Sequence, residues 1–142
     1  MGLQLKLPEG KPLEYLAGQY IDILLRDGRR RSFSIANRPE AGSNLELHVR
    51  QVPNGRFTGH VFEGLKEREL LRFQVPFGTF FLRPDSTGPV ILMAGGTGLA
   101  PIKAILEEAF HQGIDRRFHL FWGVRAWHDL YLHDQLLGLS HE

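Results

Sequence analysis

A glycine-rich turn constrains the fold of this chain more than any other feature of its sequence. The apolar run at residues 90–94 is typical of a strand buried on both faces of a parallel sheet. The tetrapeptide GGTG follows at residues 95–98, and an amphipathic pattern predicts a helix from about Pro101 to His111. Proline suits the first helical position, because its missing N–H would have no intrahelical partner there. Such a turn is suited to bind a phosphate or a dinucleotide, since backbone N–H groups and the positive helix end converge on it.

The pattern continues as the start of a doubly wound α/β domain. Residues 118–124 form a second apolar run, predicted to be a buried strand, and residues 129–137 predict a second helix. The glycine turn is not a Walker A loop, because no Gly-Lys-Ser/Thr follows it, and Pro101 replaces the third glycine of a Rossmann fingerprint. The alternative is a plain strand-to-helix turn without a ligand. The flanking strand and helix favour nucleotide binding.

The first half of the chain has the pattern of short antiparallel strands. Strands are expected within residues 3–7, 19–26, 30–36, 44–52, 70–75 and 78–82, with one short helix within 56–65. Asp27 and Gly28 predict a type I′ hairpin turn, which needs positive φ at both central residues. The predicted fold class is a small antiparallel β-barrel over residues 1–86, followed by the β-α-β-α beginning of a doubly wound nucleotide-binding domain over residues 87–142. The polar, proline-bearing stretch at 83–89 is the expected boundary.

Composition excludes several classes of protein. The 142 residues carry a formal net charge of +1, which gives no reason to expect a nucleic-acid partner or a polybasic membrane anchor. The absence of cysteine excludes disulfides, a cysteine nucleophile and an iron–sulfur cluster carried by this chain. None of the seven histidines has the HxxxH or HExxH spacing of a metal site, so no metal is expected. No segment has the pattern of a signal peptide or a membrane span, and we expect a cytoplasmic protein.

A second motif, Arg31-Ser32-Phe33-Ser34, lies on the returning strand of the predicted hairpin. Arginine presents a planar fork that pairs with phosphate, and a phenylalanine two residues further on lies on the same strand face, where it could stack on a flat ring. The alternative is a solvated arginine edge with Phe33 in the core. The tetrapeptide alone leaves both interpretations open.

Other polar and aromatic residues have simpler interpretations. Trp122 and Trp127 are expected to pack between sheet and helix rather than to bind a ligand. Glu107 and Glu108 are expected on the solvated side of the helix. The serines of the second motif lack a Gly-x-Ser-x-Gly context, so serine hydrolysis is not expected.

Five segments of the sequence, in one order along the chain, resemble the ferredoxin–NADP reductase-like flavoprotein family. They are RSFSIAN, HVRQVPNGRFT, PFGTFFL, LMAGGTGLAPIKAIL and LFWGVRAWHDLYL. Within the family, the NAD(P)H–flavin reductases and the reductases of CDP-6-deoxy-glucoseen biosynthesis are the most similar. The resemblance implies FAD as cofactor, with FMN as the alternative, and NAD(P)H as co-substrate.

The resemblance also implies roles for individual residues. Arg31 would pair with flavin phosphate, Phe33 would lie against the isoalloxazine ring, and Ser34, with Ser32 nearby, would hydrogen-bond close to flavin N5. The remaining residues that the resemblance assigns to the flavin are His48, Val49 and Arg50 beside the ring and Gly55, Arg56, Phe57 and Thr58 at a second phosphate site. Those that it assigns to the nicotinamide nucleotide are Gly95, Gly96, Thr97, Gly98, Pro101, Gly123 and Arg125. Ser34 and Thr97 would lie closest to the reacting atoms.

The function implied is transfer of hydride from NAD(P)H to a bound flavin, with electrons passing to an acceptor such as an iron–sulfur protein or free flavin. Members of the family normally have one more strand before Leu3 and further strands after residue 137. The alternative is therefore a truncated flavin-binding module without independent catalysis, completed by a partner or a missing segment. Unpaired sheet edges would favour a homodimer.

Overall fold

The computed structural model describes residues 1–25, 27–39 and 44–139. Its first half contains two small antiparallel sheets. Strand β1 (Gly2–Leu5) pairs with β4 (Leu45–His48), and β2 (Tyr20–Leu24) lies between β3 (Arg30–Ser34) and β5 (Arg72–Phe77). A bridge between Ile35 and Leu47 connects the two sheets. No helix in the described part of the chain is long and apolar enough to cross a membrane.

The apolar residues of the first half meet in one core because their alternation matches the two-residue period of a strand. The buried residues of this core are Tyr15, Ile21, Ile23, Ile35, Leu45, Leu47, Val49, Phe57 and Val61. The last two lie four residues apart on helix α1 (Arg56–Glu63), so that one helix face closes against the strands. The short predicted helix is thus confirmed.

Two expectations for the first half are wrong in detail. The hairpin forms with Gly28 at a φ of +79°, but its hydrogen bonds are not those of a type I′ turn with Asp27 and Gly28 as the two central residues. Leu25 instead accepts a hydrogen bond from the N–H of Gly28 and donates its own N–H to Arg29, as in a longer loop with a glycine bulge. Residues 78–82 do not form a strand, because Gly78, with a φ of +99°, turns the chain out of the sheet after β5.

The second half begins with a parallel pair of strands. Strand β6 (Val90–Gly95) pairs in register with β7 (Phe118–Gly123), and helix α2 (Leu99–His111) connects them through the 3₁₀ turn η1 (Gly96–Gly98). Helix α2 begins two residues earlier than predicted, which leaves Pro101 inside the first turn, where its missing N–H is still harmless. The second helix, α3 (His133–Leu139), begins four residues later than predicted, after the 3₁₀ turn η2 (Trp127–Asp129).

The strands of the second half are buried on one face only, contrary to the prediction. Leu92 packs against α2, whereas Ile91 and Met93 on the opposite face of β6 are 68% and 77% exposed. Phe121 on β7 is exposed on the same outer face. An apolar run does not reveal whether both faces of the sheet are covered, and in the described part of the chain only one is.

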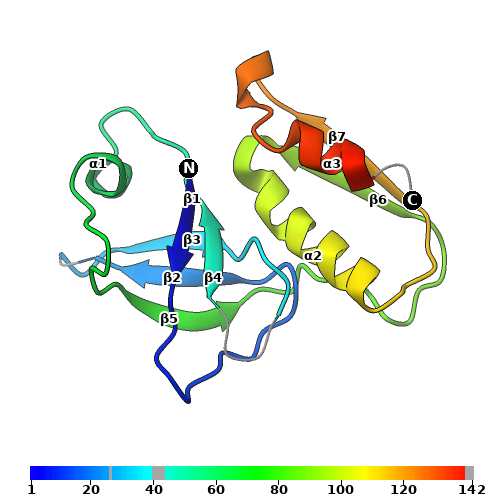
Figure 1. Ribbon diagram of the computed structural model, residues 1–142, viewed down its shortest axis with the longest axis horizontal. Coiled ribbons are helices and arrows are strands. Elements are labelled where there is room, and N and C mark those ends of the chain that lie inside the picture. Colours follow the sequence, from blue (N-terminus) through cyan, green and yellow to red (C-terminus); the bar gives the residue numbers. More distant parts are fainter. Residues whose placement is uncertain (26, 40–43, 140–142) are drawn as a thin grey trace.

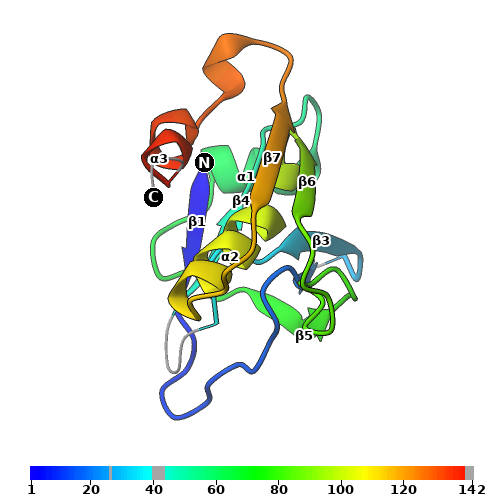
Figure 2. The same ribbon diagram turned by 90° about the vertical axis from the view of Figure 1, so that its right-hand side faces the viewer.

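Helix α2 lies between the β6–β7 sheet and the first half of the chain (Figures 1 and 2). One side of the helix packs on the β6–β7 sheet through Leu99, Ile102 and Leu106. Another side, with Ala104 and Ile105, packs against Ala17 from the segment that precedes β2. Because both sides are covered, even the lysine of this helix, Lys103, is buried.

Candidate active site

A cavity of about 260 Å³ lies where β4 meets the glycine turn. Its lining residues are Met1, His48, Val49, Arg50, Gln51, Phe62, Gly96, Thr97, His128, Asp129 and Tyr131. The cavity therefore brings together two of the segments predicted to bind cofactors, residues 48–50 and the glycine turn. Its volume is below the ~300–1,000 Å³ usual for ligand sites, so it suits one end of a dinucleotide rather than two whole cofactors.

The glycine turn has the geometry that ligand binding requires. Gly96 has a φ of +52°, and the indole N–H of Trp122 donates to its carbonyl at 2.9 Å, which orders the turn. A Cβ at Gly96 would lie 3.8 Å from Nη1 of the exposed Arg50, so a guanidinium faces the turn from the first half of the chain. No side chain caps α2 at Gly98, but the N–H of Leu99 already bonds to the carbonyl oxygens of Gly96 and Thr97 and Pro101 has no N–H, so the start of α2 offers fewer N–H groups to a ligand than an ordinary helix start.

The Arg31–Ser34 motif forms most of β3, at one edge of its sheet. Pairing with Ile23 and Ile21 places Arg31 and Phe33 on one face of the strand, and the Phe33 ring packs 5.3 Å from that of Phe57. The exposed side of the strand carries Ser32, whose hydroxyl hydrogen-bonds to Asp22 at 2.6 Å. None of the four motif residues lines the 260 Å³ cavity, and their contact with a flavin stays a prediction.

The predicted second phosphate site lies at the start of α1. Gly55 is the N-cap residue, and no side chain caps the helix there. Arg56 is the first residue of the helix. The hydroxyl of Thr58 is already engaged: it contacts the carbonyl oxygens of Val52 and Gly55 and accepts from the N–H of Val52. A phosphate at this position would therefore rely on backbone N–H groups.

Gly123 and Arg125 lie at the carboxyl end of β7. Gly123 pairs in register with Gly95, so the ends of both parallel strands meet beside the glycine turn. Ligands of open α/β sheets bind at this edge. Trp122 packs against the sheet and helix as expected, whereas Trp127 is 76% exposed and its ring contacts that of His133.

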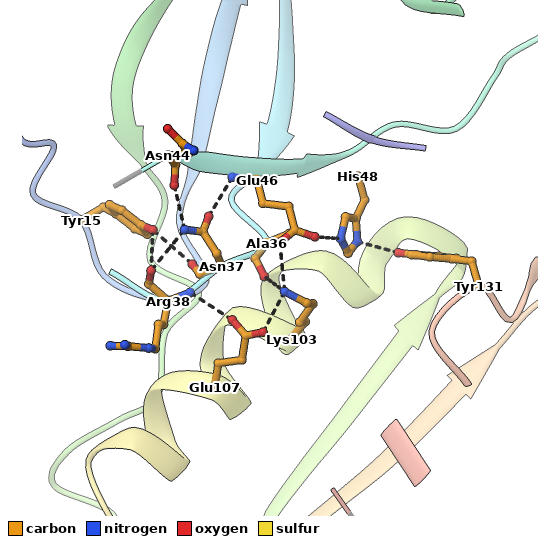
Figure 3. A network of polar contacts seen from close by, with 10 residues as sticks. All are labelled: Tyr15, Ala36, Asn37, Arg38, Asn44, Glu46, His48, Lys103, Glu107 and Tyr131. Atoms are coloured by element: carbon orange, nitrogen blue, oxygen red, sulfur yellow. Dashed lines mark hydrogen bonds and ion pairs between the residues drawn. The ribbon is translucent and has the colours of Figure 1, made fainter. Parts of the chain in front are cut away.

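A polar network that the sequence analysis missed crosses from the first half to the second (Figure 3). The ammonium of Lys103 on α2 lies 3.1 Å from the carbonyl oxygen of Ala36, 3.2 Å from Glu46 and 2.8 Å from Glu107. The other carboxylate oxygen of Glu46 lies 2.8 Å from Nε2 of His48, and Nδ1 of His48 lies 2.7 Å from the hydroxyl of Tyr131.

This network corrects one expectation. Glu107 and Glu108 do not form a solvated face, because Glu107 pairs with Lys103 and accepts the N–H of Arg38, while Oε2 of Glu108 is buried. The imidazole of His48 is buried and held by Glu46 and Tyr131, so a contact between His48 and a flavin, which stays a prediction, would involve its backbone. The only local signal was the four-residue spacing of Lys103 and Glu107, which suits an ion pair on one helix.

The network shifts the pKa values of His48, Glu46 and Tyr131. Burial lowers the pKa of His48, although the contact with Glu46 opposes that effect. Because a carboxylate only accepts, the neutral imidazole carries its proton on Nε2, and Nδ1 accepts from Tyr131. Burial alone would raise the pKa of Glu46, but His48 and Lys103 together lower it. Burial and the nearby charge of Glu46 raise the pKa of Tyr131 to about 12.

We expect the folded chain to lose stability as the pH falls below about 6.5, the ordinary pKa of histidine. The folded pKa of His48 is lowered, so the unfolded chain binds more protons in this window and acid favours unfolding. The charged groups that face the ring are Glu46, Lys103 and the amino terminus, with Tyr131 on the other side.

Melting temperatures from pH 8 to pH 5 measure the effect. His48→Asn should flatten the profile, whereas replacement of the exposed His111 by glutamine should not; equal profiles for all three proteins would contradict this assignment.

The chain belongs to the oxidoreductase FAD-binding domain family, whose model matches residues 1–82, and residues 92–142 match the oxidoreductase NAD-binding domain. These matches confirm the resemblance and the predicted fold class.

Characterised relatives support this assignment. CDP-6-deoxy-L-threo-D-glycero-4-hexulose-3-dehydrase reductase of Yersinia pestis is 47% identical over 91% of this chain and 39% of its own length. Terephthalate 1,2-dioxygenase reductase component 1 of Comamonas is 45% identical over 92% of this chain and 38% of its own. The chain thus spans about two fifths of the length of these relatives.

Solved structures share the fold. The Amycolatopsis cytochrome P450 reductase GcoB superposes with a TM-score of 0.89 at 37% identity, over 99% of this chain and 43% of that one. Phthalate dioxygenase reductase, described as transferring electrons from pyridine nucleotides to [2Fe-2S], superposes with a TM-score of 0.82 at 25% identity, over 95% of this chain and 42% of its own.

Proposed function

We propose that this chain is a flavin-dependent NAD(P)H oxidoreductase unit that positions a nicotinamide at the glycine turn against FAD held by the first half. The observation that carries the proposal is the cavity shared by residues 48–50 and the glycine turn, in a chain that matches both an FAD-binding and an NAD-binding family model. When bound, the two cofactors supply the hydride chemistry, from nicotinamide C4 to flavin N5. The acceptor we favour is an iron–sulfur protein, because phthalate dioxygenase reductase passes electrons to [2Fe-2S].

The residues of the site fit the two cofactors by their chemistry. The uncapped start of α1 offers N–H groups to phosphate oxygens, and the exposed Arg31 and Arg50 offer guanidinium groups. In this proposal Arg31 binds flavin phosphate, Phe33 contacts the ring, and Ser34 and Thr97 lie nearest the reacting atoms. The protein itself contributes binding, orientation and exclusion of water, which need no nucleophile or general base.

We propose a cytoplasmic location for the protein. We place the boundary between its two modules near residue 86. Arg116, which precedes β7, binds the connecting segment through the carbonyl of Gly88 at 2.7 Å and the hydroxyl of Ser86 at 3.3 Å. The same guanidinium also lies 3.4 Å from the carbonyl oxygen of Arg83, so these contacts attach the connecting segment to the second module and support a boundary within or beside it.

A flavin-binding module without independent catalysis is the second candidate. The exposed apolar outer face of β6 and β7, with Ile91, Met93 and Phe121, favours it, because such a face is normally covered by protein. A homodimer that pairs sheet edges such as β3 would be one way to complete such a module.

Anaerobic titration of the purified chain distinguishes these candidates. We expect a yellow FAD complex whose flavin absorbance, at about 450 nm, is bleached by NADH or NADPH. A yellow chain that neither nucleotide reduces would favour the binding module. A chain that takes up neither FAD nor FMN would overturn both.

Arg31→Ala should weaken flavin binding by roughly 10–100-fold, because a charge-assisted hydrogen bond contributes about 1.5–3 kcal/mol. Fluorescence quenching of added FAD measures the dissociation constant. The matched control is Arg30→Ala, one position along β3 on the opposite face of the strand. If the two variants bind FAD equally well, the assignment of Arg31 is wrong.

A further inference from the structure

Lys103 joins the two halves of the molecule through contacts that the proposed hydride transfer does not itself require. The residue is 7% exposed, and its ammonium reaches two oxygens of the first half, the carbonyl of Ala36 and the carboxylate of Glu46. A buried ammonium is costly unless it is paired and hydrogen-bonded, and apolar packing could cover the same surface. The retained charge therefore calls for a role beyond burial of area.

The position of Lys103 suggests that role. Helix α2 starts directly after the glycine turn, and Lys103 lies five residues beyond Gly98, roughly 7.5 Å along a rigid helix. Glu46 lies on β4, two residues before His48 and the segment that lines the cavity. The Glu46–Lys103 ion pair thus connects the element that carries the glycine turn to the strand that forms the opposite wall.

A second link reaches the same carboxylate from the other side of the cavity. Trp122 holds the carbonyl of Gly96, its ring lies 5.4 Å edge-on from Tyr131, and Tyr131 bonds His48. His48 in turn bonds Glu46. Glu46 is therefore the point at which both links from the second half meet the first.

We propose that the Glu46–Lys103 ion pair is a positioning device that sets the separation between the glycine turn and β4, and with it the distance between the two cofactors. This inference rests on the proposed function. Hydride transfer requires reacting atoms about 3–3.5 Å apart, and a misplacement of 1 Å can slow such a reaction about 100-fold. An ion pair with fixed hydrogen-bond distances defines one arrangement of the halves, whereas apolar surfaces of similar area tolerate sliding.

The kinetic test compares Lys103→Met and Glu46→Gln with the wild-type chain in anaerobic single-turnover reduction by NADH. We expect the reduction rate constant at saturating NADH to fall about 10–100-fold, with FAD affinity changed less than about threefold. The double variant should be no slower than the slower single variant, because both changes break one pair. The control Lys66→Met removes an exposed lysine and should leave the rate unchanged.

A second measurement does not depend on activity. The chain has no cysteine, so spin labels can be placed at Leu70→Cys in the first half and Met93→Cys in the second, both highly exposed positions. Pulsed dipolar spectroscopy should show a narrow distance distribution for the labelled parent and a broader or shifted one once Lys103→Met is added. Glu46→Gln, which preserves shape, supplies the same comparison if Lys103→Met does not fold.

These measurements separate failure of this inference from failure of the proposed function. An unchanged distance distribution in both variants, or an unchanged reduction rate in folded variants, would overturn the positioning role and leave a purely structural ion pair. If the wild-type chain binds FAD but neither NADH nor NADPH reduces it, the proposed function fails. The label distances then decide by themselves whether the pair fixes the two halves.

Discussion

Gly18→Ala should lower the free energy of unfolding by about 2–5 kcal/mol, a large share of the stability of a small protein. Gly18 has a φ of +103°, which side chains rarely adopt, in the turn that precedes β2. A Cβ at this position would overlap the carbonyl oxygen of Phe80 and lie 3.0 Å from Cδ1 of Ile105. Backbone strain and a clash with the main chain act together, and a main-chain oxygen cannot rotate away as a flexible side chain could.

The effect should be measured by urea unfolding followed by circular dichroism. Gly88→Ala is the matched control, because a Cβ there would meet no heavy atom within 4 Å and the residue has no positive φ. We expect the control to stay within about 0.5 kcal/mol of wild type. Equal losses in the two variants would contradict the close approach of Phe80 and Ile105 to Gly18.

Local patterns in the sequence were sufficient to predict most elements of this fold. The alternation at Leu45, Leu47 and Val49 predicted a strand with one buried face, and all three residues are buried. The glycine turn between an apolar run and an amphipathic pattern predicted a strand, a turn and a helix in that order. These signals are local, because side-chain periodicity and glycine conformations are properties of neighbouring residues.

The polar network was not predictable in the same way. Lys103 and Glu46 are 57 residues apart, and His48 and Tyr131 are 83 apart. Nothing near Lys103 indicates that a second layer of protein covers its side of the helix. Its burial follows from the packing of Ala17 against Ala104 and Ile105, which is a tertiary contact.

The same distinction between local signals and tertiary contacts applies to the candidate site. The motif residues were identified from their chemistry and order, but their arrangement was not. The structure places Arg50 beside Gly96 and puts residues 48–50 and Thr97 in one cavity, while Phe33 packs against Phe57. The motifs and their order along the chain indicate which chemical groups a site contains. Only the fold determines which of those groups share a cavity.

Leu47→Ala should lower the free energy of unfolding by about 2–5 kcal/mol, the range for large-to-small changes at fully buried positions. Leu47 is completely buried, faces Leu3 across the β1–β4 pair and forms the bridge to Ile35 that connects the two sheets. Alanine keeps the backbone hydrogen bonds, so the loss would come from the cavity and the missing apolar contacts. Thermal and urea unfolding measure it, with Leu70→Ala, at a position 94% exposed, expected within about 0.5 kcal/mol of wild type.

Because Leu47 lies between Glu46 and His48 without joining the polar network, this variant should be less stable and still reduce its flavin at the wild-type rate while folded. A reduction rate as slow as that of Lys103→Met would mean that the rate follows stability rather than the ion pair.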